Sequence, residues 1–71
     1  MNIKQLTELT AYLNTISEDD QGSISIGACF DGYIFVEDYF GDILDAQKMH
    51  DMGYVYINSE KWWALEEELP A

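Results

Sequence analysis

The chain has 71 residues, of which 48% are hydrophobic and 14% aromatic, which predicts a single domain over residues 1–71 with one small core. Fourteen acidic residues stand against three basic ones, giving a formal net charge of −11. Direct binding to nucleic acid or to an anionic membrane is therefore disfavoured, because phosphate groups require cationic side chains.

A basic protein surface is the expected partner of so acidic a chain, unless the acidity serves only solubility. Cys29 is the single cysteine, so no intrachain disulfide is expected, which fits a reducing cytoplasm. The start of the chain lacks the apolar segment of a signal peptide. No apolar run approaches the length of about 20 residues that crosses a bilayer.

The first predicted element is a helix over residues 3–17, where apolar residues recur at helical spacing. Asn2 is the expected N-cap, and Gln5 can complete a capping box. The acidic residues 18–20 would be unfavourable at a helix C-terminus. We therefore expect them in a loop.

A hairpin is predicted next, from a strand over residues 23–30, the turn residues Asp31-Gly32 and a second strand in YIFVEDY. A two-residue loop would pair Phe30 with Tyr33, whereas a three-residue loop pairs Cys29 with Tyr33. We favour the three-residue loop because it gathers the aliphatic side chains on one face. Tyr33 and Phe35 then lie on the opposite, outer face.

A second helix is expected from Gly41-Asp42 to a stop at Gly53, with Asp42 as N-cap and Asp45 in the first turn. The segment YVYI, residues 54–57, predicts a third strand. Alternation places its two tyrosines, Tyr54 and Tyr56, opposite the aliphatic face.

A last helix is predicted over residues 59–69, with Trp62, Leu65 and Leu69 as its inner stripe and Pro70 just past its end. The expected fold is thus α+β, with a three-stranded antiparallel sheet (the hairpin plus one strand) and about three helices in the order α-β-β-α-β-α. Whether the last helix covers the outer sheet face decides if the aromatic rings there are core or an exposed patch.

No motif predicts catalysis. His50 is the only histidine, and its neighbour Asp51 would not face it on a helix. Cys29 has no nearby cation that would activate the thiol. The sequence has neither a metal-ligand spacing nor a phosphate-binding glycine loop. We therefore expect a non-enzymatic protein with no catalytic, cofactor-binding or metal-binding residues.

The segment EDYFGDILDAQKMHD, residues 37–51, concentrates five carboxylates beside two aromatic rings. Helix capping accounts for Asp42 and Asp45, but not for the other three. Carboxylates three or four residues apart on a helix lie about 5–6 Å apart at Cβ, a range comparable to neighbouring phosphates along a DNA strand. A rigid array of them can present a phosphate-like pattern to a nucleic-acid-binding groove.

In its small size, acidity, aromatic content and lack of catalytic motifs, the whole chain resembles phage-encoded inhibitors of host defence, the anti-CRISPR and anti-restriction proteins that mimic DNA. Locally, EDYFGDILDA, residues 37–46, is similar to the segment with which barstar-type inhibitors block their ribonuclease, which implies contacts from Tyr39, Gly41 and Asp45. The chain departs from that pattern in strand order and at Met49, where those inhibitors carry another acid. Both resemblances imply a protein of the bacterial cytoplasm that occupies a basic nucleic-acid site.

The leading hypothesis is a non-enzymatic inhibitor that docks its acidic surface onto the nucleic-acid site of a bacterial nuclease or CRISPR effector. The alternative is a small interaction module (an adaptor, an antitoxin-like protein or a dimeric regulator) that uses an aromatic sheet face, and a homodimer is compatible with it. The candidate partner-binding residues are Glu18, Asp19, Asp20, Tyr33, Phe35, Glu37, Asp38, Tyr39, Asp42 and Asp45.

Overall fold

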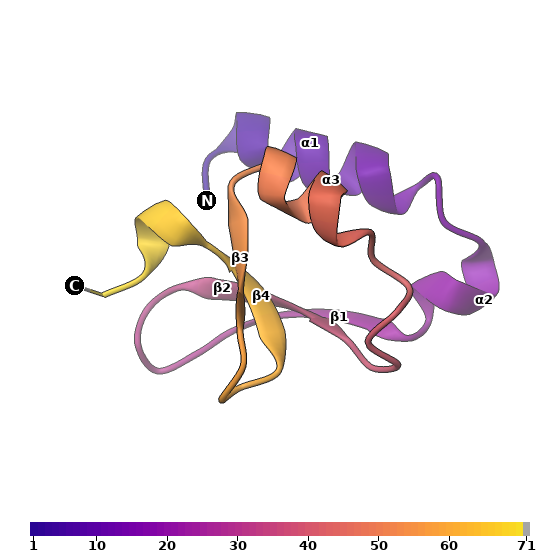
Figure 1. Ribbon diagram of the computed structural model, residues 1–71. Coiled ribbons are helices and arrows are strands. Elements are labelled where there is room, and N and C mark those ends of the chain that lie inside the picture. The colour runs from indigo at the N-terminus through magenta and orange to yellow at the C-terminus, as the bar shows by residue number, and fades with distance from the viewer. Residues whose placement is uncertain (71) are drawn as a thin grey trace.

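A computed structural model describes residues 1–70 of the chain (Figure 1). The fold is α+β, as predicted, but the antiparallel sheet has four strands in the order β1-β2-β4-β3 where three were expected. Helices α1 and α3 lie on the same side of this sheet (Figure 1). The elements are α1 Ile3–Leu13, α2 Glu18–Gln21, β1 Ile24–Ala28, β2 Ile34–Asp38, α3 Ala46–Asp51, β3 Tyr54–Ile57, β4 Trp62–Leu65 and the 3₁₀ turn η1 Glu66–Glu68.

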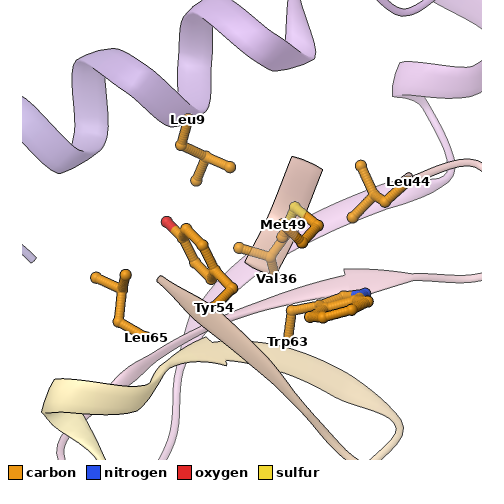
Figure 2. Packing of buried hydrophobic residues seen from close by; sticks show 7 residues of the cluster. All are labelled: Leu9, Val36, Leu44, Met49, Tyr54, Trp63 and Leu65. Carbon is orange, nitrogen blue, oxygen red and sulfur yellow. The ribbon is translucent and has the colours of Figure 1, made fainter. Parts of the chain in front are cut away.

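The core lies between the two longer helices and one face of the sheet (Figure 2). Figure 2 shows Leu9 of α1 and Met49 of α3 reaching toward side chains of β2, β3 and β4. Each such side chain, fully buried, stabilises the fold by roughly 1.5–3 kcal/mol. The buried cluster consists of Leu9, Val36, Leu44, Met49, Tyr54, Trp63 and Leu65.

Helix α1 begins as predicted, but it ends early. The Gln5 amide donates to Asn2 Oδ1 at 2.8 Å and the Asn2 amide donates to Gln5 Oε1 at 2.8 Å, which confirms the capping box. The expected loop at residues 18–20 is wrong, because these acids form the one-turn helix α2, capped by Ser17. Acids are favoured at a helix N-terminus by the helix dipole, so two helices accommodate the sequence better than one.

The β1–β2 hairpin has the three-residue loop that we favoured. Gly27 pairs with Phe35. The Cys29 amide donates to the Tyr33 carbonyl oxygen at 3.1 Å, and the Gly32 amide donates to the Cys29 carbonyl oxygen at 3.1 Å. Gly32 closes the loop with φ +89, a conformation that glycine adopts without a steric penalty. The predicted register, and with it the outward direction of Phe35, is confirmed.

The helix expected from Gly41-Asp42 begins later. Helix α3 starts at Ala46, and its N-cap is Asp45 rather than Asp42. The preceding residues form a loop because a carboxylate from β2, described below, takes up their amides. Gly53 ends the helix as predicted, with φ +93 and its amide bonded to the His50 carbonyl oxygen at 2.9 Å.

The last helix, predicted over residues 59–69, is wrong. Residues 62–65 form β4, which inserts between β2 and β3. The apolar positions of the segment have helical spacing, but its uninterrupted run WWAL is also typical of a strand buried on both faces. Trp63 faces the core, and Ala64 is fully buried on the opposite face. A central strand therefore buries the apolar side chains of this run more completely than an amphipathic helix would.

The tyrosines of β3 lie on the opposite face from the one expected. Tyr54 pairs with Leu65 and Tyr56 pairs with Trp63, so both point to the helix side of the sheet, and Val55 points outward. Tyr54 is only 1% exposed. The helix that could have covered the outer face of the sheet is replaced by β4, and neither α1 nor α3 lies over that face (Figure 1).

Candidate functional site

Asp38, the last residue of β2, organises the loop that follows it. Its Oδ1 accepts a hydrogen bond from the Gly41 amide at 3.0 Å. Its Oδ2 accepts from the amides of Ile43 and Leu44, both at 2.8 Å. The side chain is 8% exposed, so this carboxylate is a structural element of the loop rather than a surface charge. Three charge-assisted bonds to one carboxylate fix the loop against the sheet.

The loop held by Asp38 carries two exposed aromatic rings. Tyr39 is 78% exposed and Phe40 is 66% exposed. The two rings meet edge to face, with centroids 5.1 Å apart. The Tyr39 amide donates to the Ser23 carbonyl oxygen at 3.0 Å, which ties the loop to the start of β1. Rigid, exposed aromatic rings are enriched among protein-binding residues because little conformational entropy is lost when they are covered.

A surface hollow of about 380 Å³ lies beside these rings. A second hollow, of about 390 Å³, shares Asp38, Gly41 and Tyr56 with the first, so the two adjoin. Tyr56 is 40% exposed and packs against Trp63, with ring centroids 5.3 Å apart. We call the first space the aromatic hollow; it is lined by Glu37, Asp38, Tyr39, Phe40, Gly41, Tyr56 and Lys61.

Acidic residues from three parts of the chain gather around this loop. The Ser23 amide donates to the Asp20 carbonyl oxygen at 2.9 Å, and Ser23 in turn accepts from Tyr39. Helix α2 therefore lies at the same end of the molecule as the loop (Figure 1). Asp42 in the loop and Asp45 at the start of α3 are both exposed. We call this region the acidic end; its members are Glu18, Asp19, Asp20, Glu37, Asp42 and Asp45.

The acidic end is poorly neutralised. Within residues 1–70 the only ion pair joins the Met1 ammonium group to Glu68, in η1. Lys61 lines the aromatic hollow, but it makes no ion pair with the carboxylates there in the described part of the chain. Unpaired carboxylates raise the local negative potential, which attracts a basic surface and speeds its association.

The carboxylates do not form the helical array that the sequence suggested. Asp42 lies in the loop and Asp45 is an N-cap whose carboxylate accepts from the Gln47 amide at 2.9 Å. The spacing argument for helical carboxylates therefore does not apply to this pair. The acidic residues of α2 occupy consecutive positions of a single turn, so they point in different directions. The site is a cluster of charge, not a ladder of phosphate-like groups.

Tyr33 and Phe35 lie apart from this site, on the outer face of the sheet. The Phe35 ring stacks on Trp62, with centroids 4.0 Å apart and planes inclined by 12°. The Tyr33 hydroxyl accepts a hydrogen bond from Trp62 Nε1 at 3.3 Å, and Tyr33 is 5% exposed. The Trp62 bond lowers the pKa of Tyr33, but burial and the neighbouring Cys29 outweigh it, so the pKa is raised. These rings mainly cover one another.

The sequence interpretation missed three residues of the site. Phe40, Tyr56 and Lys61 were not among the candidate residues. The hairpin of β3 and β4 brings Tyr56 and Lys61 to the hollow. Its only signal in the sequence was the segment NSEK, residues 58–61, between two apolar runs. A four-residue polar loop of that kind is typical of a hairpin.

His50 contacts the ring of Trp63 edge to face, with centroids 5.3 Å apart. No cluster of three or more His, Cys, Asp or Glu side chains suited to a metal ion occurs within residues 1–70. In the same part of the chain, no helix is long and apolar enough to cross a membrane. Comparison with known proteins found no matching family model, no matching curated protein and no matching solved structure.

Proposed function

We propose that this protein is a non-enzymatic inhibitor that binds a basic surface of another protein through its acidic end. The observation that carries the proposal is the combination of unpaired carboxylates with exposed rings on a loop fixed by Asp38. The rings of Tyr39 and Phe40 provide apolar contact area. The surrounding carboxylates steer the partner and pair with its cations.

The target class that best matches this surface is the nucleic-acid site of a bacterial nuclease or CRISPR effector. Such sites are basic because they neutralise phosphate groups, and they contain flat apolar surfaces on which bases stack. An acidic end with exposed rings offers both features. Binding there would exclude nucleic acid by competition, and it would take place in the bacterial cytoplasm.

The test is displacement of labelled DNA or RNA from a panel of purified CRISPR effectors and nucleases, followed by fluorescence anisotropy. We expect at least one member to lose its nucleic acid, and we expect this inhibition to weaken steeply as salt is raised. The double variant Asp19→Lys with Asp42→Lys should weaken inhibition by more than about tenfold, since each reversal replaces an attraction with a repulsion.

The matched control is Glu8→Lys with Glu66→Lys. Both of these residues are exposed and lie outside the acidic end, and the change in net charge is identical. It should inhibit nearly as well as the original protein. Equal losses in the two double variants would show that net charge alone matters and would refute a localised site.

A second candidate function uses the outer sheet face as a docking surface for an adaptor-like contact. It is favoured by the stacked pair of Phe35 and Trp62, which neither α1 nor α3 covers. It is weakened by Tyr33, which is already buried against the face. An apolar contact there should change little with salt, and Phe35→Ala should abolish it while Asp42→Lys should not.

A further inference from the structure

Strand β1 forms an open edge of the sheet. The Cys29 amide bonds to the Tyr33 carbonyl oxygen, so the odd-numbered residues of this strand face β2. In an antiparallel pair the residues between them point their amides and carbonyls the other way. The main-chain groups that reach the open edge are those of Ile24, Ile26 and Ala28.

An apolar groove runs beside this edge, because α1 covers β1 only in part. A hollow of about 250 Å³ lies between the two elements. Ile26, on its floor, is 49% exposed. The lining residues are Thr10, Leu13, Asn14, Gln21, Ile24 and Ile26.

The same groove is extended by a stripe of α1 that turns away from the core. Leu6 lies one helical turn before Thr10, and it is 47% exposed. Ile3, one turn earlier again, is 84% exposed. Helix α1 therefore has more apolar side chains than the core buries. Leu9 faces the sheet, whereas Leu6 and Ile3 do not.

This region also lacks charged side chains, although the chain as a whole is strongly acidic. No charged side chain occurs in residues 21–30, which contain β1, or in residues 9–17, which contain the second half of α1. The strand has neither the lysine nor the proline that commonly protects a sheet edge from pairing. Two copies of a chain with a net charge of −11 repel each other, so an uncharged edge is where they approach at least electrostatic cost.

We propose that β1 pairs antiparallel with β1 of a second copy, about a two-fold axis at Ile26, and joins the two sheets into one. Ile26 then faces the partner's Ile26, and Ile24 faces the partner's Ala28. All three hydrogen-bonded pairs use main-chain groups that are directed at the open edge. The large side chain of Ile24 meets the small side chain of the partner's Ala28, and only the Ile26 pair on the two-fold axis brings two large side chains together. The strand is thus self-complementary, as an isologous interface requires.

The two-fold axis stands perpendicular to the joined sheet, so both α1 helices lie on the same side of it. Their stripes, which include Leu6 and Thr10, then face each other across the two grooves. One arrangement therefore uses both the unpaired edge and the exposed apolar stripe. A foreign strand added to the edge would leave the stripe of α1 uncovered.

Sedimentation velocity of the full chain at low and high salt tests the pairing. We expect a dimer that tightens as salt is raised, because screening reduces the repulsion between copies. Ile26→Asp places two like charges opposite each other and should raise the dimer dissociation constant by more than about tenfold. Ala28→Pro removes an amide that faces the edge and not β2, so the hairpin is retained.

Asn58→Asp is the control, because it adds the same charge at an exposed position in the β3–β4 turn, away from the β1 edge of the sheet, and its dimer should be unchanged. Circular dichroism checks that each variant folds; if Ile26→Asp unfolds the chain, Ala28→Pro decides alone. A protein that stays monomeric at every salt concentration overturns the proposal. So does a dimer that the folded β1 variants leave intact.

Discussion

The carboxylate of Asp38 and the main-chain amide of Leu44 are joined by a 2.8 Å hydrogen bond that closes the loop of the candidate site. The bond spans six residues and links the end of β2 to a residue of the core. It makes the geometry of an exposed, ring-bearing loop depend on one nearly buried acid. The proposed binding surface and the stability of the fold are therefore coupled at this residue.

Asp38→Ala should lower the free energy of unfolding by about 2–4 kcal/mol, because three amides lose a charged acceptor. Urea denaturation followed by tryptophan fluorescence measures the change. Asp31→Ala is the control, since that acid is exposed in the β1–β2 turn and should alter stability by less than about 0.5 kcal/mol. Similar small effects in both variants would contradict the role assigned to Asp38.

Tyr54→Phe should leave stability unchanged or raise it by about 1 kcal/mol near neutral pH. The Tyr54 hydroxyl is buried and finds no hydrogen-bond partner within residues 1–70, and removing an unsatisfied buried polar group recovers its desolvation penalty. Leu9→Ala is the contrasting variant: it truncates a fully buried side chain and should cost about 2–5 kcal/mol. A large loss in Tyr54→Phe would mean that the hydroxyl has a partner.

Ionisation of Tyr54 should lower the stability of the protein at high pH. Burial, with a contribution from the charge of Glu8, raises the pKa of Tyr54 to about 12. The unfolded chain then loses this proton near its ordinary pKa of about 10, before the folded chain does, so deprotonation favours unfolding. Between pH 9 and pH 11 the original protein should lose roughly 1 kcal/mol more than Tyr54→Phe. Parallel losses in the two proteins would rule out this contribution.

Gly27→Ala should disturb the outer face of the sheet. A Cβ at this position would come within 2.6 Å of Phe35 Cζ, so the ring must move and its stacking on Trp62 is lost. We expect a cost of about 1–3 kcal/mol, together with a change in the near-ultraviolet circular dichroism of the tryptophans. Gly22→Ala, whose Cβ has 3.4 Å to its nearest neighbour, should fold with normal spectra.

Added salt should raise the melting temperature. Within residues 1–70 a single ion pair offsets the acidic side chains, so most carboxylates repel one another and screening relieves that repulsion. A gain of about 1 kcal/mol would correspond to roughly 4–8 °C. Glu8→Lys with Glu66→Lys should already melt higher at low salt and respond less to added salt. Melting curves that do not depend on salt would show that the charges are better compensated.

Local sequence signals predicted the elements whose geometry depends on neighbouring residues. The capping box of Asn2 and Gln5, the register set by the loop before Tyr33 and the stop at Gly53 are all confirmed. Each depends on backbone conformations within a few residues. For the same reason, the class α+β could be predicted from the order of apolar patterns.

The errors arose where strand pairing, or a side chain of another element, decides the structure. Residues 62–65 have helical apolar spacing, but pairing with β2 and β3 makes them a strand. Asp42 is a plausible N-cap in isolation, yet Asp38 takes up the amides that would begin that helix. Of the candidate site, the sequence indicated Tyr39 and the nearby acids. It did not indicate Tyr56, because the side of the sheet on which this ring lies follows from its pairing with Trp63.

The central place of β4 affects how the chain is made. This strand is the last of the sheet in sequence, yet it separates β2 from β3 in space. During synthesis the β1–β2 hairpin leaves the ribosome with the inner edge of β2 uncovered, and this edge stays open until residues 62–65 have also emerged. The native sheet therefore cannot close before β4 is available, and shortening the chain before β4 should yield a product that chaperones hold or proteases remove.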